Sequence, residues 1–252
     1  AKGTHKTCKD YYASIGQFIR WCVVMKYING NPLENVKPKF KKPKSADQER
    51  RRWEDSELHQ LLSHPVFIQA PVKVMWVTSL VLYQGMRPGE VCQLRINDIG
   101  GIDGIDTISI TDGGDKQRVK NTQSVRVVPL HNHLIDSGFL CYVDLRRQQG
   151  HCQLFDYKPT GRNQDWSRSY CNQFAKLLTE AGFTAGDRPT AYSLRHTFID
   201  VLKKADVAEH LVAEVVGHTH EKMTFGRYGK KSSLATLQGV VNTFQIQTGG
   251  EA

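Results

Sequence analysis

A stretch rich in lysine, arginine and proline, residues 37–52, interrupts this chain and separates two parts of unequal length. The part before it carries apolar side chains at helical spacing over residues 9–29, and Gly30-Asn31-Pro32 is expected to stop that helix. One amphipathic helix cannot bury its apolar stripe alone. We therefore expect residues 1–36 to be the C-terminal end of a truncated helical domain, residues 37–52 to be a basic linker, and residues 53–252 to form the main domain.

The basic residues concentrate in and before this linker. The net charge of the chain is +9, and residues 1–52 hold 13 basic and 4 acidic residues, which leaves 21 of each in the remainder. A basic run with interspersed prolines is typical of an extended segment that follows a polyanion such as DNA, but it is equally typical of a solvated linker. The candidate DNA-binding residues of this segment are Lys37, Lys39, Lys41, Lys42, Lys44, Arg50, Arg51 and Arg52.

Composition narrows the class of protein further. No apolar run reaches the roughly 18–20 residues of a membrane span, and no secretion signal opens the chain. The chain begins at Ala1 without a methionine, so we expect a fragment of a longer protein, without a membrane partner. The six cysteines are scattered without C-x-x-C spacing, and neither they nor the histidines near Cys152 fit a common zinc pattern. We expect a reducing compartment and no metal.

After Trp53 the pattern becomes mainly helical. A strongly apolar helix is predicted over residues 71–84 and ends at Gly85, and a short helix with proline in its first turn follows at 88–94. Alternating residues predict two strands, 106–111 and 126–130, around a polar stretch. Further helices are predicted at 134–147, 166–181, 190–205, 208–216 and 221–246. The predicted fold class is mainly α with a small antiparallel β-sheet.

Three short motifs carry residues suited to phosphate chemistry. In Gly85-Met-Arg87-Pro-Gly-Glu90 a rigid turn can aim an arginine, whose forked donors match two phosphate oxygens, although Glu90 is an available partner. Tyr192 and Arg195 share one helix face. Gly217-His218 precedes Tyr228 by ten residues. Each motif alone is common in proteins of other kinds.

The ordered set over residues 53–230 resembles the tyrosine site-specific recombinase (phage integrase) family, and residues 1–45 more loosely resemble the last helix of its core-binding, DNA-binding domain. The resemblance implies the family's catalytic-domain fold. It implies that Arg87 and Arg195 are the first and second arginines of the family's catalytic motif. It also implies that His218 occupies the motif position that holds His or Trp, and that Tyr228 is the nucleophile. Lys120 resembles the hairpin lysine better than Lys116 does. The second motif usually starts with histidine, and here Tyr192 occupies that place; a phenol with a pKa near 10 can donate a hydrogen bond but is a poor base.

The resemblance also implies the reaction and the partners. DNA strands would be cleaved and rejoined through a 3′-phosphotyrosyl link, with no cofactor, metal or ATP. Double-stranded DNA is the expected substrate, several copies are expected to assemble on it as a tetramer through the C-terminal segment, and accessory DNA-bending or directionality factors are expected. The expected setting is the cytoplasm of a bacterial cell that carries a phage or mobile element.

Two alternatives share this pattern: a non-catalytic DNA-binding relative, supported by the altered second motif, and a type IB topoisomerase. The segment after Tyr228 favours the recombinase because it carries an apolar stripe suited to docking on a neighbouring copy. The alternative is that the same stripe packs on its own domain. Its residues are Leu234, Leu237, Val241 and Phe244.

Overall fold

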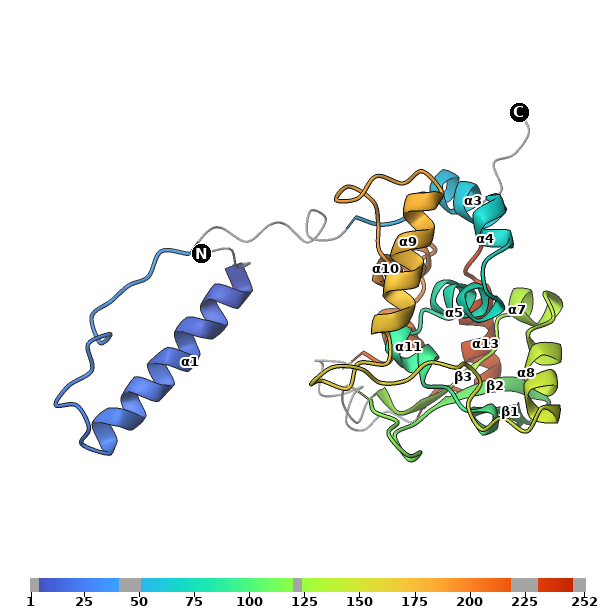
Figure 1. Cartoon of the computed structure of the whole chain (residues 1–252). Coiled ribbons are helices and arrows are strands. Elements are labelled where there is room, and N and C mark those ends of the chain that lie inside the picture. The colour runs from blue at the N-terminus through green and yellow to red at the C-terminus, as the bar shows by residue number, and fades with distance from the viewer. Residues whose placement is uncertain (1–4, 41–50, 120–123, 219–230, 247–252) are drawn as a thin grey trace. The chain divides into compact units, whose positions relative to one another are not determined.

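The computed structural model (Figure 1) describes residues 5–40, 51–119, 124–218 and 231–246. The chain separates into two compact units, Ala1–Arg50 and Arg51–Ala252. Each unit is described by itself below.

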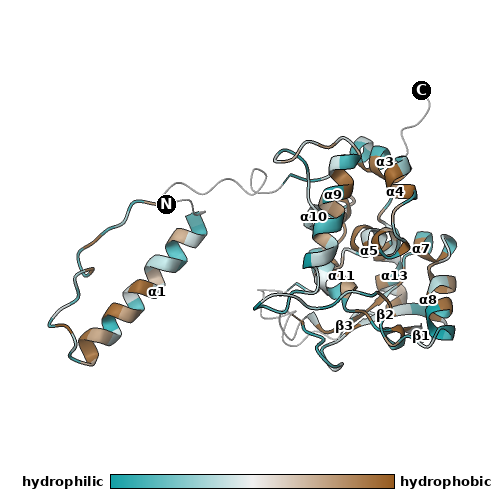
Figure 2. Cartoon of the chain, in the orientation of Figure 1, coloured by the Kyte–Doolittle hydropathy of each residue, from teal (hydrophilic) through white to brown (hydrophobic). Residues whose placement is uncertain are grey.

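The first unit is built on helix α1, His5–Val24. It ends before the predicted residue 29, because Lys26 adopts a left-handed conformation (φ 59°). There the N–H of Tyr27 bonds the carbonyl of Cys22 and the N–H of Lys26 bonds that of Val23, which closes the helix. Its apolar residues gather toward the C-terminal end (Figure 2), and no residue of the helix is buried. The following chain returns along the helix, where the Tyr12 hydroxyl donates to the Val36 carbonyl at 2.9 Å.

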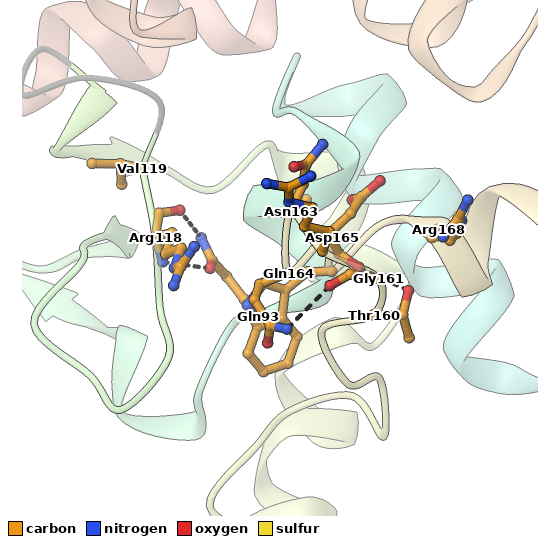
Figure 3. A pocket seen from close by; sticks show the side chains of 12 residues that line it. Gln93, Arg118, Val119, Thr160, Gly161, Asn163, Gln164, Asp165 and Arg168 are labelled. Atoms are coloured by element: carbon orange, nitrogen blue, oxygen red, sulfur yellow. Dashed lines mark hydrogen bonds between the residues drawn. The ribbon is translucent and has the colours of Figure 1, made fainter.

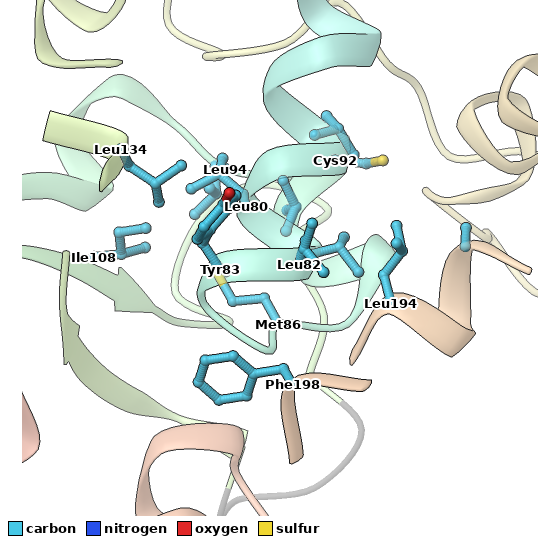
Figure 4. Packing of buried hydrophobic residues seen from close by; sticks show 14 of the residues in the cluster. Leu80, Leu82, Tyr83, Met86, Cys92, Leu94, Ile108, Leu134, Leu194 and Phe198 are labelled. Atoms are coloured by element: carbon cyan, nitrogen blue, oxygen red, sulfur yellow. The ribbon is translucent and has the colours of Figure 1, made fainter. Parts of the chain in front are cut away.

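The second unit is organised around helix α5, Val72–Tyr83, which is apolar on almost every side. Helix α10 packs directly on it. Figure 4 shows the core around α5, in which Leu80 and Leu82 lie near Met86, Leu194 and Phe198. The described residues of this unit form, besides α5, the helices α3 (Asp55–Ser63), α4 (Pro65–Ile68), α6 (Pro88–Cys92), the 3-10 turn η1 (Ile96–Asp98), α7 (Asn132–Asp136), α8 (Phe139–Gln148), α9 (Arg168–Glu180), α10 (Ala191–Lys204), α11 (Glu209–Val216) and α13 (Leu234–Asn242).

A three-stranded antiparallel sheet lies beside these helices, in the order β1 (Ile99–Ile102), β2 (Ile105–Ile110) and β3 (Arg126–Pro129). The two predicted strands correspond to β2 and β3. Strand β1 was not predicted, although Asp103-Gly104 is a two-residue hairpin signal and both residues have positive φ (51° and 76°). The prediction of a mainly α fold with a small antiparallel sheet is confirmed.

Two helix predictions need correction. The single helix expected over 134–147 is two helices, α7 and α8, because Gly138 adopts φ 87° between them and breaks the helical path. Of the helix expected over 221–246, residues 221–230 lie outside the described residues, and the rest is the shorter helix α13, which begins at Leu234 after the capping residue Ser233 and ends at Asn242.

The apolar stripe of the C-terminal segment packs on its own domain. Helix α13 contacts strand β3 and helix α11. Leu237, Val241 and Phe244 are buried, and the Phe244 ring contacts the rings of Tyr83 and Phe198. The alternative in which this stripe serves the chain's own core therefore holds, and the expectation that it docks on a neighbouring copy is not met in this structure. No helix among the described residues is long and apolar enough to cross a membrane.

Candidate active site

Gly85 makes the turn that carries the chain from helix α5 toward helix α6. Its φ of 59° is in the left-handed region, and a Cβ built on it would lie 2.3 Å from the Phe198 ring of α10. A side chain at this position would therefore be strained and would also collide with the core. The close approach brings the Gly85 carbonyl to helix α10, where it accepts a hydrogen bond from Nη1 of Arg195 at 2.6 Å.

Arg87 is the residue that caps the N-terminus of α6. Pro88 occupies the first turn, where its missing N–H costs nothing. The Glu90 carboxylate turns back and accepts the backbone N–H of Arg87 at 3.0 Å, and its other oxygen accepts Nη1 of the same residue at 2.6 Å. One carboxylate thus fixes both the main chain and the guanidinium of Arg87.

A third guanidinium, that of Arg126 at the start of β3, shares this carboxylate. Its Nη2 lies 3.0 Å from Oε2 of Glu90, and its Nη1 donates to the Ser124 carbonyl at 2.8 Å. Both side chains are almost fully buried. Arg126 therefore ties the sheet to the turn that carries Arg87.

The three guanidiniums meet at the C-terminus of helix α11. Nε of Arg126 donates to the carbonyl of Val215 at 2.7 Å. Nη2 of Arg195 donates to the carbonyl of Val216 at 2.7 Å, and Nη2 of Arg87 donates to the carbonyl of Gly217 at 3.1 Å. The last carbonyls of a helix lack intrahelical partners and carry its partial negative charge, so they orient cations.

Gly217 ends α11 in a left-handed conformation (φ 68°, ψ 49°), and the N–H groups of Gly217 and His218 both bond the Ala213 carbonyl. A Cβ at Gly217 would lie 2.6 Å from Nη1 of Arg126. The absence of a side chain therefore lets the arginine reach the helix end.

Positive charge exceeds negative charge in this cluster. Among the described residues, Glu90 is the carboxylate that forms ion pairs with Arg87 and Arg126, and Arg195 forms none. Although burial opposes ionisation of Glu90, the guanidiniums of Arg126 and Arg87 lower its pKa to about 2. Burial, together with the nearby Arg87, lowers the pKa of Arg195 to about 9. The described residues of the cluster therefore carry a net positive charge, which favours binding of an anion.

His218 and Tyr192 lie at the edge of the cluster. Partial burial, followed by the charges of Arg195 and Arg87, lowers the pKa of His218 to about 4, so its imidazole is neutral at pH 7. Tyr192, 40% exposed, has Arg87 among its electrostatic neighbours and interacts with Ser167; burial raises the pKa of its phenol. Each side chain can donate a hydrogen bond at neutral pH, and neither carries a charge there.

Of the sequence-predicted site residues, the structure brings Arg87, Tyr192, Arg195 and His218 together. Lys120 and Tyr228 lie outside the described residues. The less favoured candidate Lys116 is exposed, and its carbonyl accepts Nε1 of Trp166 at 3.0 Å.

The basic linker residues fall into three groups. Lys41, Lys42, Lys44 and Arg50 lie outside the described residues, while Lys37 and Lys39 are exposed in the first unit. Arg51 instead pairs with Glu57 at 2.6 Å, and Arg52 pairs with Asp200 at 3.2 Å. These two arginines already have carboxylate partners in the second unit.

Sequence reasoning missed Arg126 and the central place of Glu90. Glu90 was considered only as a partner that would neutralise Arg87. A signal for Arg126 was available, since it is a charged residue within the predicted buried strand 126–130, where an unpaired charge is not tolerated. The described residues contain no group of three or more His, Cys, Asp or Glu side chains that could hold a metal ion.

Comparisons with a family model and with curated proteins indicate the same protein family. The model described as "Phage integrase family" matches residues 51–233. A tyrosine recombinase of Agathobacter rectalis is 25% identical over 150 residues, which cover 59% of this chain and 44% of that protein. This chain spans about half the length of the curated relatives it matches, 44% and 60%.

Two solved structures share the fold. The Tn1549 transposon integrase in complex with a circular intermediate DNA has a TM-score of 0.64 at 17% identity, over 94% of this chain and 79% of that one. A lambda integrase dimer bound to a COC′ core site has a TM-score of 0.60 at 16% identity, over 91% of this chain and 63% of that one. At these identities the likeness concerns the fold alone.

The shared carboxylate yields a stability prediction. Glu90→Gln keeps the shape but leaves Arg87 and Arg126 without their buried counter-charge, so the free energy of unfolding at pH 7 should fall by about 3–5 kcal/mol. Because the folded-state pKa of Glu90 is about 2, below the ordinary 4.5, its contribution is present above pH 4.5 and is lost as the pH falls toward 2. The deficit of the variant should therefore shrink over that range, as measured by urea unfolding at several pH values.

The matched control is Glu180→Gln, which removes a half-exposed carboxylate paired with Lys176 at 3.7 Å on helix α9. Its effect should be only about 0.3–0.5 kcal/mol. Equal effects of the two substitutions at pH 7 would show that the Glu90 pairs do not hold the site together.

Proposed function

This chain belongs to the phage integrase family, and we propose that it is the catalytic part of a site-specific recombinase that cleaves and rejoins DNA through a 3′-phosphotyrosyl link to Tyr228. The observation that carries the proposal is the meeting of Arg87, Arg195 and Arg126 at one helix end, where Glu90 is the carboxylate that pairs with two of them in the described part of the chain. A phosphodiester supplies the missing negative charge.

The geometry suits a phosphate because guanidinium groups have planar, forked donors. Arg87 and Arg195 each donate one N–H of the guanidinium to a carbonyl at the C-terminal end of α11, and these bonds hold both side chains in place before any substrate binds. Donors that are already oriented stabilise the charge that develops on the non-bridging oxygens of the transition state without reorganising. Arg126, whose donors are taken by Glu90, Ser124 and Val215, acts as a positioning residue.

In the proposed cleavage step the phenol of Tyr228 gives its proton to solvent water, and the resulting phenolate oxygen attacks the scissile phosphorus. A bond forms between that oxygen and phosphorus, the bond from phosphorus to the 5′-oxygen breaks, and Lys120 gives a proton to the leaving 5′-oxygen. The guanidiniums of Arg87 and Arg195 favour the phenolate form of Tyr228 by their charge. Rejoining reverses these steps with the 5′-hydroxyl of a second strand as the attacking group.

The remaining residues donate hydrogen bonds to the phosphate in this proposal. His218 is neutral at pH 7 and offers one N–H, and Tyr192 offers its phenolic O–H in the place where the family usually has histidine. The reaction needs no metal, because the arginines supply the positive charge. It needs no ATP, because the phosphotyrosyl link keeps the energy of the broken bond.

Substrate and assembly are part of the same proposal. The related solved structures include an integrase with DNA and an integrase dimer on a core site, which supports double-stranded DNA as the substrate and several copies acting together. We propose that the chain acts as a tetramer in a bacterial cell that carries a phage or mobile element, with accessory DNA-bending or directionality factors. The expected docking through the C-terminal stripe is not part of this proposal, because Leu237, Val241 and Phe244 are buried in the chain's own domain. Lys37 and Lys39, with the neighbouring linker lysines, bind the DNA backbone.

Tyr228→Phe should abolish the covalent protein–DNA adduct while leaving DNA binding intact, because only the attacking oxygen is removed. The measurement uses nicked suicide substrates that carry the target site and denaturing gel electrophoresis, in which the adduct migrates as a slow band. Adduct formed by the Phe variant at the wild-type level would contradict the assignment. Tyr83→Phe is the control, since this tyrosine is buried in the core with its pKa raised to about 12 and should leave adduct formation unchanged.

The Lys120→Ala variant should cleave ordinary DNA much more slowly than wild type. On a substrate in which sulfur replaces the bridging 5′-oxygen, the same variant should cleave at nearly the wild-type rate. A thiolate leaves without protonation, so the general acid becomes dispensable. Lys116→Ala is the comparison and should be close to wild type on both substrates. Rescue by sulfur in Lys116→Ala, but not in Lys120→Ala, would move the general acid to Lys116.

A further inference from the structure

A hollow of about 690 Å³ lies beside the candidate site, between two loops of the second unit. One wall is formed by residues 160–168, which lead into helix α9, and the other by Arg118 and Val119, just before Lys120 in sequence. Gly89 and Gln93 of the α6 region contribute the floor. Figure 3 shows Arg118 and Arg168 on opposite sides of this view, with the loop that carries Gly161 and Gln164 between them.

Both walls are fixed by hydrogen bonds within the fold. Gln93 holds the backbone of Arg118 twice, donating to its carbonyl at 2.7 Å and accepting its N–H at 2.8 Å. Nε1 of the buried Trp166 donates to the Lys116 carbonyl and so joins the two loops. Thr160 and Asp165 exchange backbone hydrogen bonds at 2.9 and 3.1 Å across a tight turn. The hollow is therefore shaped before a ligand arrives.

Three arginines face this hollow: Arg118, Arg162 and Arg168. Within the described part of the chain, none of their guanidiniums lies within 4.0 Å of a carboxylate, whereas the exposed Arg147 has one, that of Asp144. The Arg168 guanidinium crosses directly over Gly161, where an added Cβ would lie 2.9 Å from Nη1. The described part of the fold thus brings together three guanidiniums that form no ion pair, an arrangement that favours binding of a polyanion.

The residues that line the hollow neighbour the candidate active site in the fold. Gly89 of its floor lies in the helix that Arg87 caps. Oδ1 of Asp165 accepts both the N–H and the hydroxyl of Ser167, at 2.8 and 2.7 Å, and Ser167 in turn interacts with Tyr192. Asp165, the acidic residue among the described lining residues, therefore accepts hydrogen bonds from its own loop and supports Tyr192 through Ser167, and it forms no ion pair with the three arginines.

We propose that this hollow binds the DNA backbone that flanks the scissile phosphate, with Arg162 and Arg168 each contacting a phosphate. The proposal rests on the proposed function and extends it from the reacting phosphate to the neighbouring strand. Arginine suits this task because its fork matches phosphate oxygens. The turn at Thr160–Asp165 carries Arg162 and positions it for this contact.

The test measures binding of a fluorescent DNA duplex by the full chain at a series of salt concentrations. The double variant Arg162→Gln, Arg168→Gln should bind more weakly than wild type. The slope of log affinity against log salt should fall in magnitude by about 1.8, which is about 0.9 for each lost phosphate contact. The matched control is Arg147→Gln, Lys176→Gln, which removes the same charge from two exposed residues that are paired with Asp144 and Glu180.

The control should keep the wild-type slope. If the double variant Arg162→Gln, Arg168→Gln has the same slope and affinity as the control, the proposal is overturned, because these arginines then contact no phosphate. Thermal unfolding of both variants verifies that the fold is intact, which is expected because all four side chains are exposed. Adduct formation by the wild-type chain tests the proposed function separately, so the failure of either idea is visible without the other.

Discussion

The carbonyl end of helix α11 is the point on which the rest of the site depends. Three consecutive carbonyls, those of Val215, Val216 and Gly217, each accept one guanidinium, from a strand, a helix and a helix cap that are distant in sequence. Such an arrangement requires a helix that ends abruptly and without a side chain in the way. Gly217 provides both conditions, since it adopts the left-handed conformation and its missing Cβ leaves space for Arg126.

The net positive charge where the three arginines meet the end of α11 accounts for the proposed binding of a DNA phosphate. Among the described residues, Arg87 and Arg126 share the Glu90 carboxylate and the buried Arg195 forms no ion pair, so the cost of burying these charges is only partly offset. Burial first, and the charges of the neighbouring arginines second, lower the pKa of His218 and of Arg195. A phosphodiester in this position would relieve that imbalance, and the relief would be greatest in the transition state, where negative charge increases.

The sequence predicted the fold class and the residues whose role depends on local spacing. Arg87 beside a proline, Tyr192 three residues before Arg195, and Gly217-His218 are each set by one turn or one helix, and the structure places them together. Arg126 escaped prediction because its partners Glu90 and Val215 are 36 and 89 residues away in sequence. The stripe of Leu237 and Phe244 has the same periodicity whether it packs in its own domain or on a neighbour, so only the tertiary structure could decide.

The most direct test of this account is the pKa of His218, followed by NMR of the labelled imidazole in the Tyr228→Phe variant, free and bound to duplex DNA. The account predicts a value near 4 in the free protein, held down by partial burial and by the arginine cluster, and a clear rise when a DNA phosphate enters the site and compensates that charge. An ordinary value near 6.5 in the free protein, or a value that DNA does not change, would contradict the claim that these arginines form an unfilled phosphate site.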